Sequence, residues 1–207
     1  MAEESGGEHM SLTPKTDRGT QTKEKLLLAA ERVFADLGYQ DASVAKITNH
    51  AGVGQGTFYL YFGSKLEIFE ELVYDLNRRV RRAMSEGAAS ATNRIERERE
   101  GFKAFFKFTA EHPALYRIIR QAEFVSPKAL KHHYSKIVEG YQEGIARAEE
   151  EGEIMDLDPE VASWMLMGIG ELIGMRWVLW SEDGEVPDEV FENMMRFIES
   201  GLQRGER

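Results

Sequence analysis

The segment Ser43–Lys65, SVAKITNHAGVGQGTFYLYFGSK, reads as a helix, a tight turn, a second short helix and the start of a third. Ser43 is a favourable N-cap residue, and the apolar residues after it share one helical face: Val44, Ile47 and Ala51. Gly52 supplies the turn, because glycine adopts a positive φ at little cost. The second helix buries an aromatic pair four residues apart, Phe58 and Phe62. The pattern therefore predicts a helix-turn-helix.

The opposite side of the second short helix is polar or small. It carries Gln55, Gly56, Thr57, Tyr59 and Tyr61. A helix with small residues at its start and hydrogen-bonding side chains beyond them can lie in a DNA major groove. The segment therefore favours DNA binding over a helical hairpin that serves only packing.

A longer stretch around this motif, AAERVFADLGYQDASVAKITNHAGVGQGTFYLYFGSKLEIF, resembles the DNA-binding domain of the TetR/AcrR family of transcriptional regulators. The resemblance runs from about Thr20 to about Leu72 and rests on several linked motifs, which makes it far more specific than a lone helix-turn-helix. The other two thirds of the chain fits the family only in length and helical content.

This resemblance implies an all-α protein of about nine helices. A three-helix DNA-binding domain would come first, and a helical domain for effector binding and dimerisation would follow. We therefore expect a flexible tail over residues 1–18, a DNA-binding domain over 19–66 with its motif at 43–62, and a ligand-binding and dimerisation domain over 67–207. The first helix is predicted over Thr22–Leu37, with Gly38 as its C-terminal cap.

The same resemblance assigns the DNA contacts. Thr57, Tyr59 and Tyr61 would contact phosphates or bases, one of the two tyrosines being partly core, and Lys65 would contact phosphate. The remaining expected contacts come from the residues themselves. Ser43 and Lys46 can hold the DNA backbone from the first motif helix, Gln55 can read an adenine edge, Gly56 adds almost no bulk, and Arg18 can act from a basic arm.

Four positions depart from the family's usual pattern. Gly54 and Gln55 stand where Ser or Thr and then Lys or Arg are usual, and Leu60 replaces a frequent basic or polar residue. These changes predict fewer phosphate contacts from the second motif helix than the family usually makes. Thr48 stands where Ala is usual, and its hydroxyl can bond to a carbonyl of its own helix.

The net charge of the whole chain argues against DNA binding, but the distribution of the charge does not. The whole chain carries a formal charge of −10, but residues 11–65 hold seven basic and five acidic side chains. The acid is therefore concentrated in the rest of the chain, away from the DNA-binding segment. A net charge of +2 attracts DNA only weakly. Useful affinity for DNA therefore requires two copies of the domain and neutral hydrogen-bond donors to phosphate.

Several classes are disfavoured. Cysteine is absent, so thiolate metal ligands and disulfides are not available. His132 and His133 are adjacent and point apart on a helix, which disfavours a metal site and leaves their role open. No nucleophile–base pair or phosphate loop is visible, so we expect a protein that is not an enzyme and needs no cofactor. No apolar run could span a bilayer and residues 1–10 are polar, so we expect a cytoplasmic protein without membrane contact.

The C-terminal two thirds predicts an effector cavity among helices rich in aromatic residues. Arg120 and Glu171 lie on otherwise apolar helices and are candidate polar anchors, although an internal ion pair or an exposed position would explain each equally well. A largely apolar effector, such as an acyl thioester or another lipid-like compound, fits this composition. The full set of expected ligand contacts is Phe102, Phe106, Tyr116, Arg120, Tyr134, Trp164, Met167 and Glu171.

The last two helices carry the most unexplained apolar surface, and in the family such helices form a four-helix dimer interface. We therefore expect a homodimeric repressor that leaves a palindromic double-stranded DNA operator when a small molecule binds. The alternatives are an activator of the same family and a helical protein-binding adaptor that does not bind DNA. Operator sequence, regulated genes and effector identity are outside what the sequence can give.

Overall fold

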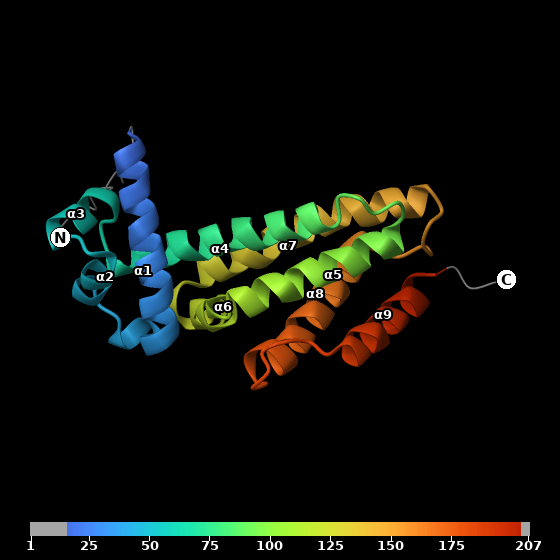
Figure 1. Ribbon diagram of the computed structural model, residues 1–207. Coiled ribbons are helices and arrows are strands. Elements are labelled where there is room, and N and C mark those ends of the chain that lie inside the picture. Colours follow the sequence, from blue (N-terminus) through green and yellow to red (C-terminus); the bar gives the residue numbers. More distant parts are fainter. Residues whose placement is uncertain (1–15, 204–207) are drawn as a thin grey trace, which may run out of the picture.

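The computed structural model describes residues 16–203. This part of the chain forms nine α-helices and one π-helical segment and contains no strand (Figure 1). The all-α prediction is thereby confirmed. The elements are α1 (Asp17–Asp41), α2 (Val44–Ala51), α3 (Gln55–Tyr61), α4 (Lys65–Gly87), α5 (Arg94–Glu111), α6 (Ala114–Val125), α7 (Pro127–Glu150), α8 (Pro159–Gly174), η1 (Met175–Leu179) and α9 (Asp188–Leu202).

Side-chain caps start most of these helices, including Ser43 at the start of α2 as predicted. Each capping oxygen accepts a hydrogen bond from the backbone N–H three residues later, which satisfies a donor that the helix itself cannot. Gly52 ends α2 in the left-handed region, with a φ of 68°. The capping residues are Ser43, Ser64, Asn93, Ser126 and Asp158.

The first helix differs from its prediction at both ends. It begins at Asp17, five residues before Thr22, because the Thr16 hydroxyl accepts the N–H of Gly19 at 3.1 Å and caps the helix. Residues 16–18 are thus not part of a tail, and the rest of the predicted tail lies outside the described residues. Gly38 takes a positive φ of 75°, as a cap would, but one further helical turn follows it to Asp41.

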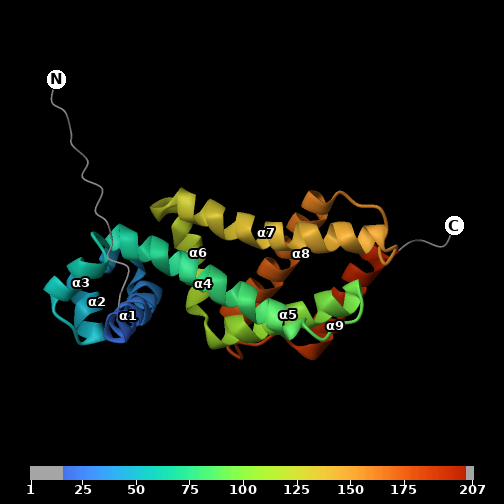
Figure 2. The ribbon, with the colours of Figure 1, turned by 90° about the horizontal axis from the view of Figure 1, so that it is seen from above.

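α1, α2 and α3 form one end of the molecule, and α4 runs from them along the second domain (Figures 1 and 2). Phe34, Tyr39 and Phe69 pack with ring centroids 5.2–5.8 Å apart, which places Tyr39 at the corner between α1 and α4. The same hydrophobic cluster continues into α5, α6 and α7. The two domains therefore share one core, which couples their positions.

In the second domain, α8 and α9 lie on the side away from α4 (Figure 1). α8 is apolar on nearly every side and packs closely where it carries glycine. A Cβ on Gly170 would lie 2.7 Å from the Phe102 ring, and one on Gly174 would collide with the Tyr116 hydroxyl oxygen. At these two glycines the absence of a side chain lets aromatic side chains approach the helix closely. Gly168 has only open space beside it. None of the helices within residues 16–203 is long and apolar enough to cross a membrane.

Candidate DNA interface and effector cavity

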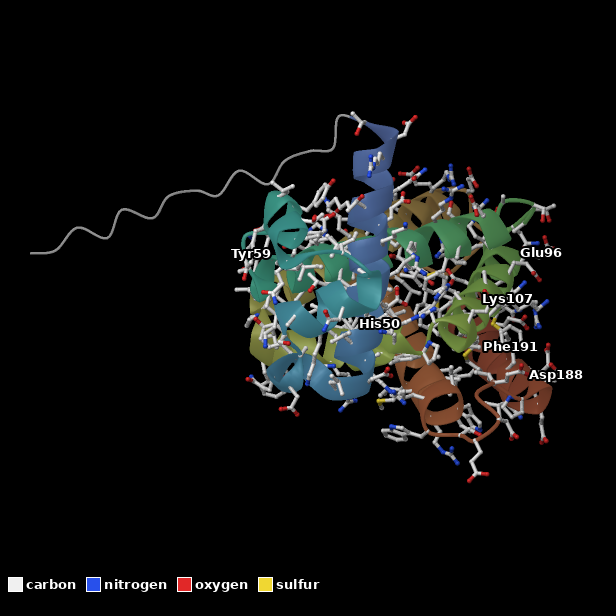
Figure 3. All side chains as sticks on the ribbon, turned by 60° about the vertical axis from the view of Figure 1, so that its left-hand side comes forward. His50, Tyr59, Glu96, Lys107, Asp188 and Phe191 are labelled. Carbon is white, nitrogen blue, oxygen red and sulfur yellow. The ribbon has the colours of Figure 1, made fainter. Side chains whose placement is uncertain are left out.

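The helix-turn-helix presents α3 on an aromatic anchor. Phe58 and Phe62 are fully buried, and this fixes which side of α3 faces outward. Tyr59 is 48% exposed and lies at the DNA-binding end of the molecule with the exposed His50 of α2 (Figure 3). Gln55 and Gly56 are exposed at the start of the helix. The packing of two phenylalanines is thus what displays the polar side.

The predicted contacts Arg18, Thr57 and Tyr61 line one groove between the start of α1 and the start of α3. Because α1 begins early, Arg18 belongs to its first turn and is held beside α3. Tyr61 is partly buried against the core, whereas Tyr59 is exposed, with its ring edge-on to that of the buried Phe58 at a centroid distance of 5.3 Å. The ambiguity between the two tyrosines is resolved in this way: Tyr61 is the partly buried one.

The two predicted lysine contacts are already engaged by backbone carbonyls. The Lys65 ammonium donates to the carbonyl oxygens of Tyr39 at 2.7 Å and Ala42 at 2.9 Å, and it lies 4.3 Å from the centroid of the Tyr39 ring. Lys46 donates to the Asp41 carbonyl at 2.9 Å but is exposed. The structure therefore gives Lys65 a different role from the predicted phosphate contact: it binds the carbonyls at the end of α1.

Two hydroxyls of α2 have the expected local roles. Ser43 accepts the N–H of Lys46 at 3.2 Å, and its own proton remains free to be donated. The Thr48 hydroxyl donates to the Ala45 carbonyl at 3.1 Å, as predicted for a threonine inside a helix.

An apolar cavity of about 50 Å³ lies among α4, α5, α6, α7 and α8. This is room for a few water molecules. Six of the eight predicted ligand contacts line it: Phe102, Tyr116, Arg120, Tyr134, Met167 and Glu171. Several lining residues were not predicted as ligand contacts, and among them are Met84, Ile119, His133, Ile137 and Tyr141. Ile137 and Tyr141 lie on the same apolar face of α7 as Tyr134, a periodicity that could have assigned them.

The other two predicted contacts lie outside the cavity wall. Phe106 packs edge-on against Phe191 of α9 with ring centroids 6.3 Å apart, inside a separate hydrophobic cluster. Trp164 is 46% exposed, and its ring centroid lies 6.0 Å from that of Tyr134, which lines the cavity. Phe106 and Trp164 do not themselves line this cavity, and as effector contacts both remain predictions. For Trp164, α8 is apolar on nearly every side, so composition does not say which of its residues face a given neighbour.

Three polar groups in the cavity wall differ in how well they are satisfied. The Tyr134 hydroxyl donates to the Glu171 carboxylate at 2.9 Å. Burial and this carboxylate raise the pKa of Tyr134. The Tyr116 hydroxyl, in contrast, is buried and has no hydrogen-bond partner among the described residues. Leaving such a group unpaired costs about 1–3 kcal/mol, which a ligand oxygen would recover.

Arg120 and Glu171 do not form an ion pair in the described part of the chain. Arg120 is exposed, with its Nη1 atom 2.8 Å from the sulfur of Met175. The negative charge of Glu171 instead meets the Tyr134 hydroxyl. Of the two predicted polar anchors, only Glu171 has a hydrogen bond across the cavity wall.

His133 and His132 have unlike environments, as their adjacency predicts. His133 is buried, and the Asn77 amide nitrogen lies 2.9 Å from its carbonyl oxygen and 3.2 Å from its Nδ1 atom. Burial first, and then the nearby His132 and Arg81, lower the pKa of His133 to about 4, so its ring is neutral at pH 7. His132 is at the surface, edge-on to Tyr74. No cluster of three metal-ligating side chains exists within residues 16–203.

α6 contacts both the cavity and the DNA-binding domain. One side of it lines the cavity through Tyr116 and Ile119. The other side holds the kinked end of α1, where Gln121 accepts the N–H of Tyr39 at 2.6 Å and donates to the Phe34 carbonyl at 3.3 Å. α6 therefore connects the cavity wall to the end of α1.

A second link between the domains is polar. Arg79 of α4 donates to the Glu31 carboxylate of α1 at 3.0 Å, and its other terminal nitrogen lies 3.1 Å from the His112 ring between α5 and α6. Glu31 is buried, so this contact is shielded from solvent. Three helices of the second domain are thus tied to α1 near one point.

Comparison with known proteins matches the helix-turn-helix region most specifically. Residues 26–72 match the family described as "Bacterial regulatory proteins, tetR family". The uncharacterized HTH-type transcriptional regulator YdgC of Bacillus subtilis is 34% identical over 116 residues, 54% of this chain and 58% of that protein. The HTH-type transcriptional activator FasR of Mycolicibacterium smegmatis is 33% identical over 110 residues, 51% of this chain and 48% of that protein. The matches thus span about half the length of these relatives.

A third relative matches over more of its length. The fatty acid metabolism regulator protein of Bacillus subtilis is 29% identical over 166 residues, 75% of this chain and 82% of that protein. The alignment therefore reaches well beyond the helix-turn-helix and into the second domain.

Solved structures share the whole fold. The fatty acid degradation regulator FadR from Bacillus halodurans superposes with a TM-score of 0.78 at 21% identity, covering 90% of this chain and 96% of that one. FadR from Bacillus subtilis in complex with stearoyl-CoA gives a TM-score of 0.75 at 22% identity, covering 87% and 99%. At these identities the likeness establishes the fold of both domains.

Proposed function

Because the chain belongs to the TetR family of bacterial regulatory proteins, we propose that it is a homodimeric transcriptional repressor released from a palindromic operator by a largely apolar effector. Relatives at this level are transcriptional regulators, and the proposed role is accordingly not enzymatic and requires no cofactor. A cytoplasmic location follows from a role on DNA. The observation that carries the proposal is the cavity, whose wall includes the same helix that holds α1.

The effector class follows from the cavity wall. Aromatic and aliphatic side chains dominate it, and one buried hydroxyl lacks a partner among the described residues. Two relatives are named for fatty acid regulation and one solved relative holds stearoyl-CoA. We therefore propose an acyl thioester or a related lipid-like compound.

The small size of the cavity supplies the mechanism. About 50 Å³ holds a few waters but not a long acyl chain, so the chain enters only if the surrounding helices separate. α6 forms part of that wall and is bonded to α1 through Gln121. Effector binding would therefore favour a different position of the DNA-binding domain. DNA affinity then falls by the difference in the effector's affinity for the two arrangements.

Dimerisation is supported by exposed apolar side chains on the last two helices. On α8 they include Trp164, Met165 and Leu172, the last of them 61% exposed, and on α9 they include Phe197, which is 70% exposed. Met165 and Leu172, seven residues apart, share one face of α8, and such exposed apolar side chains indicate an association site. A second copy packed on α8 and α9 would set two α3 helices at a fixed spacing, about 34 Å or one DNA turn.

The DNA contact is proposed to rest mainly on neutral groups. Gln55, Thr57 and Tyr59 supply hydrogen bonds from α3, and Ser43 supplies one from α2. Arg18, and Lys46 with its exposed ammonium, supply positive charge at the edges. Lys65 is not included, since backbone carbonyls already occupy it. Such a modest footprint makes the second copy of the domain necessary for useful affinity.

The opposite sign of regulation is the second candidate, because one relative is named an activator. A mobility-shift experiment separates the possibilities. DNA from upstream of the protein's own coding region is titrated with protein, without and with stearoyl-CoA. We expect a shift that the thioester reverses. Activation would appear as a shift that the thioester strengthens, and a protein-binding adaptor would give no shift at all.

The effector class has its own decisive outcome. Calorimetry should detect binding of acyl compounds to the free protein. If no acyl thioester or fatty acid gives a binding signal while a cationic drug clearly binds, the proposed lipid-like effector is contradicted.

A further inference from the structure

A second, open pocket of about 300 Å³ adjoins the apolar cavity between α4, α5 and α7. Met84, Ile137 and Tyr141 line both spaces. These side chains therefore stand between the two spaces. Met84 is the most adaptable of them, because an unbranched thioether chain rearranges readily. A ligand that pushes Met84 aside would occupy both spaces at once.

The second pocket is rich in arginine. Arg81 of α4 and Arg94 and Arg97 of α5 line it, and Glu98 is the only carboxylate that does so among the described residues. Glu98 is buried and paired with Arg94. The charges of Arg81 and Arg97 are therefore left in excess. This is unexpected in a domain whose sequence is strongly acidic.

The two excess arginines keep donors available. Arg81 uses its Nε atom to donate to the Asn77 side chain at 3.0 Å, and its terminal nitrogens have no partner in the part of the chain that the structure describes. Arg97 is exposed, and its side chain has no hydrogen bond or ion pair within residues 16–203. It also lines a neighbouring pocket with Arg147, where Glu151 and Glu153 offset part of the charge.

Glycine keeps this end of the domain open. Gly101 and Gly140 line the second pocket, and a Cβ on either would meet only open space. Gly144 makes room for Arg94, whose Nη1 atom would collide with a Cβ there. Glycine inside a helix costs about 1 kcal/mol relative to alanine. Arg94 itself is 5% exposed, and its Nε atom has no partner among the described residues.

We propose that this arginine pocket, formed by Arg81, Arg94 and Arg97, holds the anionic head of the effector while the tail passes Met84 into the apolar cavity. The inference rests on the proposed function and states how the effector is oriented, with its head in the arginine pocket and its tail in the apolar cavity. A phosphate-bearing head, as in an acyl-CoA, fits better than a lone carboxylate. The pocket is open and large, two guanidinium charges are uncompensated, and Arg97 reaches toward a further basic position at Arg147. Arg120, on α6, then has no role in binding the head.

The test compares three dodecyl probes by calorimetry on the full chain: dodecanoyl-CoA, dodecanoate and dodecan-1-ol. We expect the thioester to bind most tightly. Arg81→Gln and Arg97→Gln should each raise its Kd about tenfold and leave the Kd of the alcohol unchanged. The matched control is Arg82→Gln, next to Arg81 on α4 but exposed and paired with Glu86. Arg94 is left intact, because its loss would leave the buried Glu98 carboxylate without its ion-pair partner.

Gly140→Leu provides a second variant that adds bulk in the pocket without touching a charge. It should weaken dodecanoyl-CoA binding and spare the alcohol, because Gly140 lines only the arginine pocket. Equal thioester affinity in the parent, Arg81→Gln, Arg97→Gln and Gly140→Leu would overturn the head-group site and leave the effector class standing. The head-group site is also overturned if the alcohol or the carboxylate binds as tightly as the thioester. Failure of all three probes to bind the parent would overturn the proposed effector class, and the head-group site with it.

Discussion

The DNA-binding domain and the effector domain of this protein are both helical, yet they are determined in different ways. In the first, short-range features fix the structure: a serine cap, a left-handed glycine and two phenylalanines four residues apart. In the second, the functional feature is a space between helices that are far apart in the sequence. Local chemistry is therefore enough to display α3, whereas the cavity depends on how long helices pack. The shared core means that neither domain is independent of the other.

The largest expected effect tests the local determination of α3. Phe58 is fully buried, so Phe58→Ala should lower the free energy of unfolding by about 3–5 kcal/mol and abolish DNA binding. Urea denaturation and mobility shift measure the two effects. Phe124→Ala is the control, because that ring is 86% exposed on α6. If the Phe58 variant kept its stability, the aromatic anchor would not be what holds α3.

The next effect concerns the packed interior of the second domain. His133 has a pKa of about 4 in the folded protein, against 6.5 for a free histidine. The unfolded chain therefore binds a proton more readily between these values, so stability falls as pH drops from 6.5 to 4, by up to about 3 kcal/mol. Urea midpoints across this window should show the loss. His133→Gln should flatten that slope, and an unchanged slope would assign the pH dependence to other groups.

The close approach of α8 to its neighbours gives an intermediate effect. A side chain on Gly174 would collide with the Tyr116 hydroxyl, so Gly174→Ala should destabilise the protein by about 1–3 kcal/mol. Gly168→Ala has open space and should stabilise it by up to about 1 kcal/mol. Thermal unfolding of the pair is a direct comparison on one helix. Equal melting temperatures would show that the packing at Gly174 can relax.

The smallest effect is on the DNA surface itself. Tyr59→Ala should weaken operator binding about tenfold without changing the melting temperature, since the ring is half exposed. Leu60→Ala, at the neighbouring and similarly exposed position, should change neither quantity. Fluorescence anisotropy with labelled operator DNA measures both variants. Parental affinity in the Tyr59 variant would remove that residue from the proposed contacts.

The sequence predicts those features that depend on short-range contacts, and it does not predict those that depend on contacts between distant residues. The helix starts were predictable, because Ser64, Asn93, Ser126 and Asp158 act on their own helices within three residues. The early start of α1 was missed because Thr16 stands within a polar segment where no apolar periodicity begins. The engagement of Lys65 was missed because its acceptors lie more than twenty residues away in sequence.

The cavity was predictable only as a helical face. Tyr134 and Tyr116 were found because aromatic residues on amphipathic helices must face a core. The position of Trp164 could not be predicted, because α8 is apolar on nearly every side and its exposed residues have the same composition as its buried ones. The arginine pocket was not predicted. Arg81 lies on α4 and Arg94 and Arg97 lie on α5, so their meeting in one pocket depends on how these two helices pack.

The central claim is that effector binding and DNA binding are coupled through α6. The most direct measurement is operator affinity by fluorescence anisotropy across a titration with stearoyl-CoA, for the parent and for Gln121→Ala, which loses the bonds to Tyr39 and Phe34. We expect saturating thioester to weaken operator binding of the parent at least about tenfold, and the variant to show a smaller ratio while it still binds both ligands. Equal operator affinity with and without bound thioester in the parent would contradict the coupling outright.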